Sequence, residues 1–250
     1  MENKKGFHVD MENGKHDYYF DGKKMTGVTT VLSVISKPAL IGWAARMTAN
    51  YIANNWDANM RPVDDIDLWS KLIEDSMKAH AKKRDKAAES GTDVHLEIEG
   101  YIKECIEKYH GYVIPKLKEA LEGKITKQTN HFITWALKNA VKFLESEKVV
   151  YDKDLFLAGT ADFVCEIDGK KFIGDIKTSS SIYGLEPFAQ CAAYAHMLDY
   201  KLDGTIIINL KKSGEFDEEK DVYFRFDLET DWKFFEAALT LYRLKATWKK

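Results

Sequence analysis

The stretch GTADFVCEIDGKKFIGDIKTSSS, residues 159–181, decides how the second half of the chain is interpreted. Apolar and β-branched residues form two short runs around an Asp-Gly pair, which predicts two strands joined by a tight turn. Asp162 falls inside the first run, whereas Asp175 and Lys177 lie at the end of the second. Residues two apart on a strand face the same way, so Asp175 and Lys177 share a face. A strand pair has no structural need for these charges.

Two interpretations of this charged set remain open from the residues alone. A carboxylate and an ammonium on one strand face can form a surface ion pair, which contributes little to stability. If the strands pair antiparallel, Asp162 comes near Asp175, and two close carboxylates repel unless a cation lies between them. That cation is Lys177 or a divalent metal such as Mg²⁺ or Mn²⁺, which prefers oxygen ligands. With a metal, the set fits phosphodiester hydrolysis, because the ion polarises the phosphate and lowers the pKa of a bound water.

Composition predicts a soluble globular protein with one sizeable core. The chain has 250 residues, of which 45% are hydrophobic and 31% charged, and its net charge of −3 gives no overall bias toward nucleic acid. The three cysteines, Cys105, Cys165 and Cys191, are widely separated, so we expect reduced thiols rather than disulfides or a metal cluster. No apolar run approaches the ~20 residues of a membrane span, and the N-terminal residues lack a signal-peptide pattern. A cytoplasmic protein without membrane contact is expected.

Hydrophobic periodicity predicts helices in the first half of the chain and alternating strands and helices in the second. Residues 1–16 are polar and expected to be loose. A hairpin with Asp21-Gly22 as its turn follows them, and residues 61–91 are expected to begin as a connector and to continue as a helix. Gly91 is expected to end one helix and Thr92 to cap the next. Helices are predicted over 39–56, 92–109, 126–147, 183–200 and 230–248. Three strands are predicted within 148–179, and one strand each over 204–212 and 220–229. This order predicts an α/β fold with a mixed central sheet flanked by helices and a helical N-terminal lobe. We expect residues 1–90 and 91–250 to form parts of one compact unit.

Four motifs, in chain order, resemble the PD-(D/E)XK nuclease superfamily and its RecB-like, phage-type exonuclease branch. They are GTDVHLEIE at 91–99, GTADF at 159–163, GDIKTS at 174–179 and QCAAYAHML at 190–198. TGVTTVLSVISKPALIGWAA at 26–45 also resembles this branch, in which a V-T-x-[VI]-[LI] strand precedes a proline and a tryptophan-bearing helix. The resemblance implies a restriction-endonuclease-like core and a viral or prophage origin.

The resemblance also implies a role for each matching residue. The metal ligands would be His95, Asp162, Asp175 and the backbone carbonyl of Ile176. Lys177 would be the catalytic lysine, and Gln190 and Tyr194, four apart on one helical face, would support it and the phosphate. Glu99, one helical turn beyond His95, is either an outer group supporting the ligands or a second metal, or a solvated carboxylate. The implied ion is Mg²⁺ or Mn²⁺. An iron–sulfur cluster is not expected, because three scattered cysteines cannot hold one.

A basic run before the His95 helix is the predicted DNA contact. It comprises Lys78, Lys82, Lys83, Arg84 and Lys86. Such residues bind the phosphate backbone without reading sequence, and a solvated helix face is the equally weighted alternative. Trp43, Trp56 and Trp69 could stack on unpaired bases, although core packing is favoured for at least two of them.

The expected function is therefore that of a divalent-metal-dependent deoxyribonuclease. We expect an exonuclease or DNA-end-processing enzyme of recombination, repair or phage DNA metabolism, acting on linear or single-stranded DNA ends in a bacterial or phage-infected cell. A single-strand annealing or recombination protein is a partner by analogy. The alternatives are a DNA-binding module without cleavage, a structure-specific endonuclease, and a metal-binding protein with no DNA role.

Overall fold

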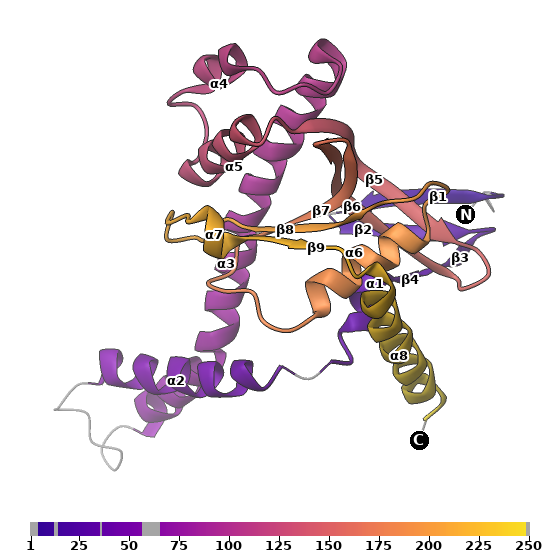
Figure 1. Cartoon of the computed structure of the whole chain (residues 1–250). Coiled ribbons are helices and arrows are strands. Elements are labelled where there is room, and N and C mark those ends of the chain that lie inside the picture. The colour runs from indigo at the N-terminus through magenta and orange to yellow at the C-terminus, as the bar shows by residue number, and fades with distance from the viewer. Residues whose placement is uncertain (1–4, 13–14, 36, 57–65, 249–250) are drawn as a thin grey trace. The chain divides into compact units, whose positions relative to one another are not determined.

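A computed structural model describes residues 5–12, 15–35, 37–56 and 66–248 (Figure 1). Residues 61–65, where the predicted connector begins, lie outside these residues. In chain order the elements are β1 (Phe7–Glu12), β2 (Lys15–Phe20), β3 (Lys23–Lys24), β4 (Thr26–Gly27), α1 (Val28–Leu32), α2 (Pro38–Asn55), α3 (Ile66–Tyr109), α4 (Pro115–Leu121), α5 (Lys127–Lys138), β5 (Lys142–Asp152), β6 (Leu157–Ile167), β7 (Lys170–Lys177), α6 (Glu186–His196), β8 (Gly204–Asn209), α7 (Glu218–Asp221), β9 (Val222–Arg225) and α8 (Leu228–Thr247).

The chain divides into two compact units. One unit contains residues 1–35 together with 94–250, and the other contains residues 36–93. The first holds both β-sheets and every residue of the site described below. We call it the α/β unit, and we call residues 36–93, which comprise α2 and the first part of α3, the helical unit.

The main sheet of the α/β unit is mixed and has six strands. Strands β4, β6, β7, β8 and β9 follow one another across it, and β5 also pairs with β6. The pairs β5–β6, β6–β7 and β8–β9 are antiparallel, whereas β4–β6 and β7–β8 are parallel. Parallel neighbours need a crossover connection, and α6 provides it between β7 and β8. The predicted α/β class with a mixed sheet flanked by helices is confirmed.

Helices cover both faces of this sheet (Figure 1). On one face, α4, α5 and the part of α3 in the α/β unit pack around Phe132, Trp135, Phe143 and Phe163. On the other face, α1, α6 and α8 bury a second apolar cluster that includes Phe235. Burying two such clusters is the main favourable contribution to folding, and it holds the strands between the helices rigidly.

The strand β6 changes partner along its length, and this change opens a fork in the sheet. Its C-terminal residues, 163–167, pair with 170–174 of β7. Its first two residues pair instead with β4. Between these two ladders, residues 159–162 have no partner on the β7 side in the described register, and β7 continues past them to Lys177. We call this place the open end of the β6–β7 hairpin.

A second, three-stranded sheet forms at the N-terminus from β1, β2 and β3. The turn between β2 and β3 lies at Asp21-Gly22, as predicted, and both residues have positive φ, 48° and 74°. Tyr18 of this sheet and Met25, which follows β3, are buried against Ala158 of β6. The N-terminal residues are therefore not a loose segment as expected, because β1 pairs along β2 from Phe7 to Glu12.

Three further local predictions were wrong. Residues 28–32, expected to form a strand, are helix α1. Their strand propensity is overridden because Val28, Val31 and Leu32 recur at helical spacing and pack against α6 and α8. The helix expected to extend to residue 147 ends at Lys138, and strand β5 begins at Lys142. Phe143 there is buried in the sheet core rather than on a helix face.

The third error concerns Gly91, which neither ends a helix nor marks a hinge in the backbone. Helix α3 runs without a break from Ile66 to Tyr109, so Thr92 lies inside it and is not an N-cap. Glycine inside a helix costs about 1 kcal/mol relative to alanine, which apolar packing on either side can offset. None of the described helices combines the length and apolarity needed to cross a membrane.

Candidate active site

Asp162 stands at the open end of the β6–β7 hairpin. Its Oδ2 accepts a hydrogen bond of 2.6 Å from the backbone N–H of Ile176, and Nδ1 of His95 lies 3.6 Å from the same oxygen. The carboxylate thus satisfies a backbone donor that the β6–β7 ladder no longer reaches. Burial and the charge of Asp175 raise the pKa of Asp162, and His95, the Ile176 N–H and Lys177 lower it, with a net pKa of about 6.

Asp175 and Lys177 face the same way, as the strand pattern predicts. The Lys177 Nζ lies 2.6 Å from Oδ2 of Asp175, whose side chain is nearly fully buried. That oxygen has no well-aligned hydrogen-bond donor among the described residues, so the contact is an ion pair held mainly by charge. Burial acts to lower the pKa of Lys177, but the charges of Asp175 and Asp162 outweigh it and raise the pKa above its usual value.

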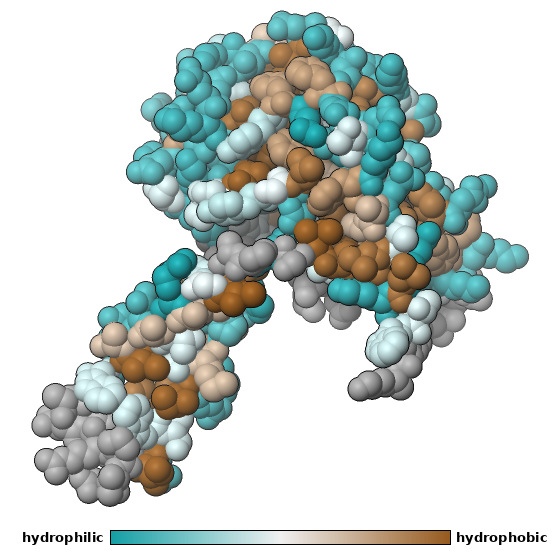
Figure 2. Space-filling view, turned by 60° about the horizontal axis from the view of Figure 1, so that its bottom comes forward, coloured by the Kyte–Doolittle hydropathy of each residue, from teal (hydrophilic) through white to brown (hydrophobic). Residues whose placement is uncertain are grey.

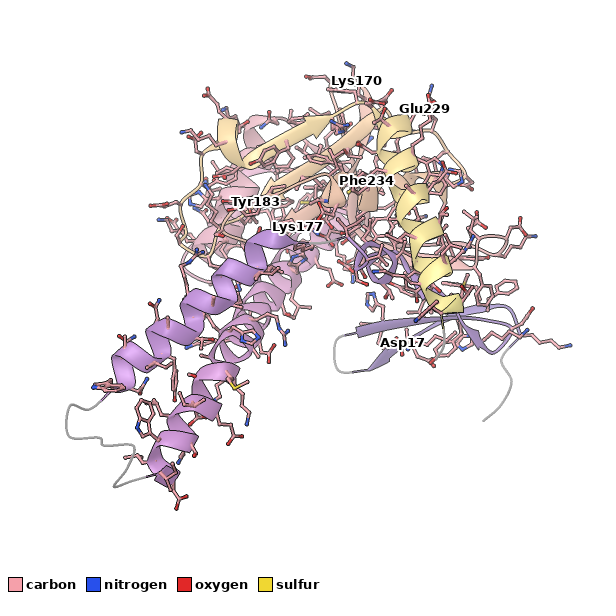
Figure 3. The ribbon with its side chains drawn as sticks, turned by 90° about the horizontal axis from the view of Figure 1, so that it is seen from below. Asp17, Lys170, Lys177, Tyr183, Glu229 and Phe234 are labelled. Carbon is pink, nitrogen blue, oxygen red and sulfur yellow. The ribbon has the colours of Figure 1, made fainter. Side chains whose placement is uncertain are left out.

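Gln190 connects this ion pair to helix α6. Its Oε1 accepts a hydrogen bond of 3.2 Å from Lys177 Nζ, and its Nε2 donates to Asp175 Oδ1 at 2.9 Å. The same Nε2 donates to the hydroxyl of Tyr194 at 3.1 Å, one helical turn further along α6. The structure therefore brings together Asp175, Lys177, Gln190 and Tyr194, which the sequence motifs single out separately. Figure 3 labels Lys177 at the end of β7.

Gly159 lets Tyr194 lie against the open end. A Cβ atom on Gly159 would lie 2.3 Å from Cε1 of the Tyr194 ring, which is closer than two carbons can approach. Burial of Tyr194 raises the pKa of its hydroxyl well above the usual value, and Asp175 adds to this, so the hydroxyl stays protonated. The first residue of the G-T-A-D motif must therefore be glycine, because any side chain there would clash with the Tyr194 ring.

The donor types at this site fit a divalent cation. One imidazole and two carboxylates are ligands that Mn²⁺ accepts, and Mg²⁺ accepts the carboxylates. The neighbouring carboxylate Asp175 raises the pKa of Asp162, and a cation between the two would relieve this repulsion. In the described part of the chain, however, no three His, Cys, Asp or Glu side chains converge closely enough to hold a metal. The side chains have the positions of an ion-paired network, and the Ile176 carbonyl stays a predicted ligand.

Two further acids belong to the same charge environment. Glu99 forms an ion pair with Lys103 on the same helix face. Glu147 of β5, which sequence analysis placed in a helix, falls opposite Asp162, because Ser146 pairs with Phe163 and Lys148 with Ala161. Its φ of 47° is unusual for a residue inside a strand. Burial and the charges of Asp162 and Glu99 together raise the pKa of Glu147 to about 7, against an opposing effect of Lys103.

The N-terminal sheet also reaches the open end, and the sequence motifs do not predict this. The hydroxyl of Thr160, two residues before Asp162, lies 3.0 Å from Nδ1 of His16 and 2.8 Å from the hydroxyl of Tyr18. These contacts join residues 144 and 142 positions apart in the chain. No local pattern in a single sequence carries a contact over such a separation.

Glu97 fixes the part of α3 that carries the GTDVHLEIE motif to helix α5. Its Oε2 accepts hydrogen bonds from the N–H and hydroxyl of Thr126, at 2.9 and 2.7 Å, and from the hydroxyl of Thr129 at 2.5 Å. These contacts join α3 to the N-terminus of α5, where a carboxylate is also favoured by the helix dipole. The turn of α3 that carries His95 is therefore anchored two residues away.

The predicted DNA-binding residues all lie on α3 in the helical unit and are exposed. Lys78 pairs with Glu74, Lys82 lies 3.2 Å from Asp75, and Arg84 lies 2.9 Å from Asp85. Exposed pairs of this kind are weak, so a phosphate can replace the acid. The predicted set also contains Lys83 and Lys86, which are exposed.

The tryptophans of the helical unit pack mainly against neighbouring rings. Trp43 meets His80 edge-on, and Trp56 meets Trp69 with ring centroids 5.0 Å apart. Trp56 is half exposed. Ile41, Ile66 and Met77 of this unit are exposed as well. Figure 2 shows apolar side chains at the surface of the unit.

Comparison with known proteins adds no assignment. No protein-family model matches the sequence, and a search of curated proteins finds no match either. The interpretation of the site therefore rests on its residues and their geometry.

Proposed function

We propose that the protein is a divalent-metal-dependent deoxyribonuclease of the PD-(D/E)XK superfamily, RecB-like branch, with a restriction-endonuclease-like core. The observation that carries the proposal is the open end of the β6–β7 hairpin. There Asp162 contacts His95 and the Ile176 N–H, while Asp175 contacts Lys177 and Gln190. These residues come from α3, β6, β7 and α6. The four elements follow one another along the chain in the same order as the four motifs of the resemblance.

The proposed roles follow from these contacts. His95, Asp162, Asp175 and the Ile176 carbonyl would hold Mg²⁺ or Mn²⁺. Such a cation, when bound, polarises the scissile phosphate and lowers the pKa of a coordinated water. Lys177 supplies a positive charge on the same buried network, where it can stabilise negative charge that develops on the phosphate. Gln190 holds the ammonium in place, and Tyr194 orients Gln190.

The same proposal covers the substrate and the cellular setting. Exposed cations of α3 would contact phosphates without reading base sequence. A linear or single-stranded DNA end is the proposed substrate, in the cytoplasm of a bacterial or phage-infected cell and with a strand-annealing or recombination protein as partner. These points rest on the resemblance to the exonuclease branch.

The test uses the full chain with linear, nicked and closed-circular DNA in Mg²⁺ or Mn²⁺. We expect degradation of the linear DNA, and a loss of at least about a hundredfold in Lys177→Ala with an unchanged far-ultraviolet circular dichroism spectrum. Lys170→Ala is the matched control, because Lys170 is exposed at the other end of the same strand. Figure 3 labels both lysines. If Lys177→Ala cleaves as fast as the wild type, the proposed site is wrong.

A DNA-binding module without cleavage is the second candidate. One observation favours it, namely that the described side chains are ion-paired rather than gathered as three metal ligands. Binding to linear DNA with no cleavage of any of the three substrates would select this candidate. Cleavage of the closed circle would instead indicate an endonuclease.

A further inference from the structure

The N-terminal sheet forms one wall of the open end. Tyr18 of β2 is buried against Ala158 of β6, and Thr160 is two residues further along the same strand. Ala161, between Thr160 and Asp162, packs into the cluster beneath α1, α6 and α8. Thr160 contacts Tyr18 and His16 away from that cluster, and Asp162 contacts His95 of α3, whose neighbours Val94 and Ile98 pack on the opposite face of the sheet. The hairpin residues that contact Thr160 therefore lie on the side of the sheet where Asp162 points.

Two side chains of β2 converge on one hydroxyl at this wall. The Tyr18 hydroxyl lies 2.8 Å and His16 Nδ1 lies 3.0 Å from Thr160 Oγ1. Burial raises the pKa of the Tyr18 hydroxyl, which therefore keeps its proton and can donate it to Thr160. With Tyr18 as the donor, Thr160 has its own proton available for Nδ1 of His16, and we assign the ring proton of His16 to Nε2 on this basis. This chain of donors leaves one N–H on the outer side of the imidazole.

Two contacts orient the ring of His16, and its Nε2 atom is available to bind a ligand. The ring meets Tyr18 edge-on, at 77° and a centroid distance of 6.2 Å, while Thr160 holds Nδ1. Within the described residues, Nε2 has no hydrogen-bond partner, and the side chain is only half-buried. An oriented donor beside a proposed phosphodiesterase site suits a phosphate oxygen, since neutral or cationic imidazole both donate from Nε2.

We propose that His16 is a further substrate-binding residue, which donates a hydrogen bond from Nε2 to a phosphate oxygen of the DNA strand held at the open end. The inference rests on the proposed nuclease function and extends the site to the N-terminal hairpin. Thr160 acts as a positioning residue, because it contacts His16 and not the DNA. Figure 3 labels Asp17, the neighbour of His16 on β2.

The test compares steady-state cleavage of linear DNA by His16→Leu, His16→Gln and Thr160→Val. Removing one donor to a charged oxygen is expected to raise KM for DNA about tenfold in His16→Leu, with kcat within about twofold of the wild type. His16→Gln keeps an amide donor near the place of Nε2, so it should restore much of the KM. Thr160→Val should raise KM less than His16→Leu and have no additional effect in the double variant.

His8→Gln is the matched control. His8 lies on the same sheet with its ring stacked on Tyr19, so it reports loss of hairpin packing rather than loss of a phosphate contact. Its KM should match that of the wild type. Thermal unfolding of every variant checks that the hairpin remains folded.

Two results would overturn the inference and leave the nuclease proposal standing. An unchanged KM in His16→Leu means that the imidazole does not contact DNA. A lower kcat at unchanged KM means that it acts through Asp162 instead. If the wild type cleaves no DNA, the nuclease proposal fails by itself. In that case the dissociation constant of the intact chain and of His16→Leu for fluorescent DNA decides the His16 question, with equal values against it.

Discussion

The two ends of the β6–β7 hairpin are built from the same two strands and differ in what holds them. At the turn end, residues 163–167 and 170–174 pair in an unbroken antiparallel ladder, and Phe163 is fully buried. At the open end, the ladder has stopped and the Asp162 carboxylate bonds to the Ile176 N–H in its place. Backbone pairing thus gives one end its rigidity, and side-chain contacts give it to the other.

The difference shows where chemistry can be placed in a buried sheet. A continuous ladder satisfies the backbone and leaves the side chains to apolar packing, as at Phe163 and Phe172. Where strands diverge, unpaired backbone groups and buried charges must find partners among side chains, which makes the site polar and dependent on single residues. Substitutions at the two ends should therefore have different consequences, the open end losing activity and the turn end losing stability.

Among the substitutions that compare the two ends, the largest effect is expected at the open end, from Gly159→Ala. The added Cβ would lie 2.3 Å from the Tyr194 ring, so the ring must shift and its hydroxyl must leave Gln190. We expect kcat for DNA cleavage to fall about ten- to a hundredfold, because small displacements of positioning groups are costly in catalysis.

Tyr194→Phe tests the same contact from the other side, since it removes the hydroxyl and keeps the ring. The double variant should lose no more activity than the worse single variant, because both changes break one contact. Independent, multiplying losses would show that Gly159 acts by another route.

The turn end should respond in the opposite way to Gly174→Ala. A Cβ there would lie 2.0 Å from Cζ of Phe163, in the fully packed core. Overpacking of this kind lowers the free energy of unfolding by about 1–3 kcal/mol, which urea denaturation would measure. Cleavage per folded molecule should fall less than in Gly159→Ala, although Gly174 directly precedes Asp175. A stable variant whose kcat falls as far as that of Gly159→Ala would remove the distinction between the two ends.

The smallest effect is expected from Glu147→Gln, and it depends on pH. The pKa of Glu147 rises from 4.5 to about 7 through burial and the charges of Asp162 and Glu99. A raised acid pKa favours the protonated folded state, so this group's stabilising contribution is complete below pH 4.5 and is lost as pH rises through 7.

Without metal, Glu147→Gln should therefore raise the melting temperature at pH 8 by roughly 2 °C and leave it unchanged at pH 4. Differential scanning calorimetry in EDTA measures both values. A gain of equal size at both pH values would mean that charge is not the cause.

Sequence patterns predicted the β6–β7 hairpin, the face shared by Asp175 and Lys177, and the helix that carries Gln190 and Tyr194. Each of these depends on contacts between residues close in sequence, whose period or spacing is visible locally. The sequence patterns did not predict that Thr160, His16 and Glu147 lie at the open end. These residues come together only when strands from distant parts of the chain pair. The prediction of a strand at 28–32 was wrong for the same reason, because packing against α6 and α8 stabilises a helix there.

The orientation of the Gln190 amide determines where positive and negative charge can lie at the site. Its oxygen faces the ammonium of Lys177 and its nitrogen faces the carboxylate of Asp175. A rotated amide would set like poles against each other on both sides, so the uncharged residue admits a single arrangement of plus and minus around it. A glutamate in its place would repel Asp175, and a lysine would repel Lys177. The uncharged amide of Gln190 thus fixes which side of the site carries the positive charge and which side the negative charge.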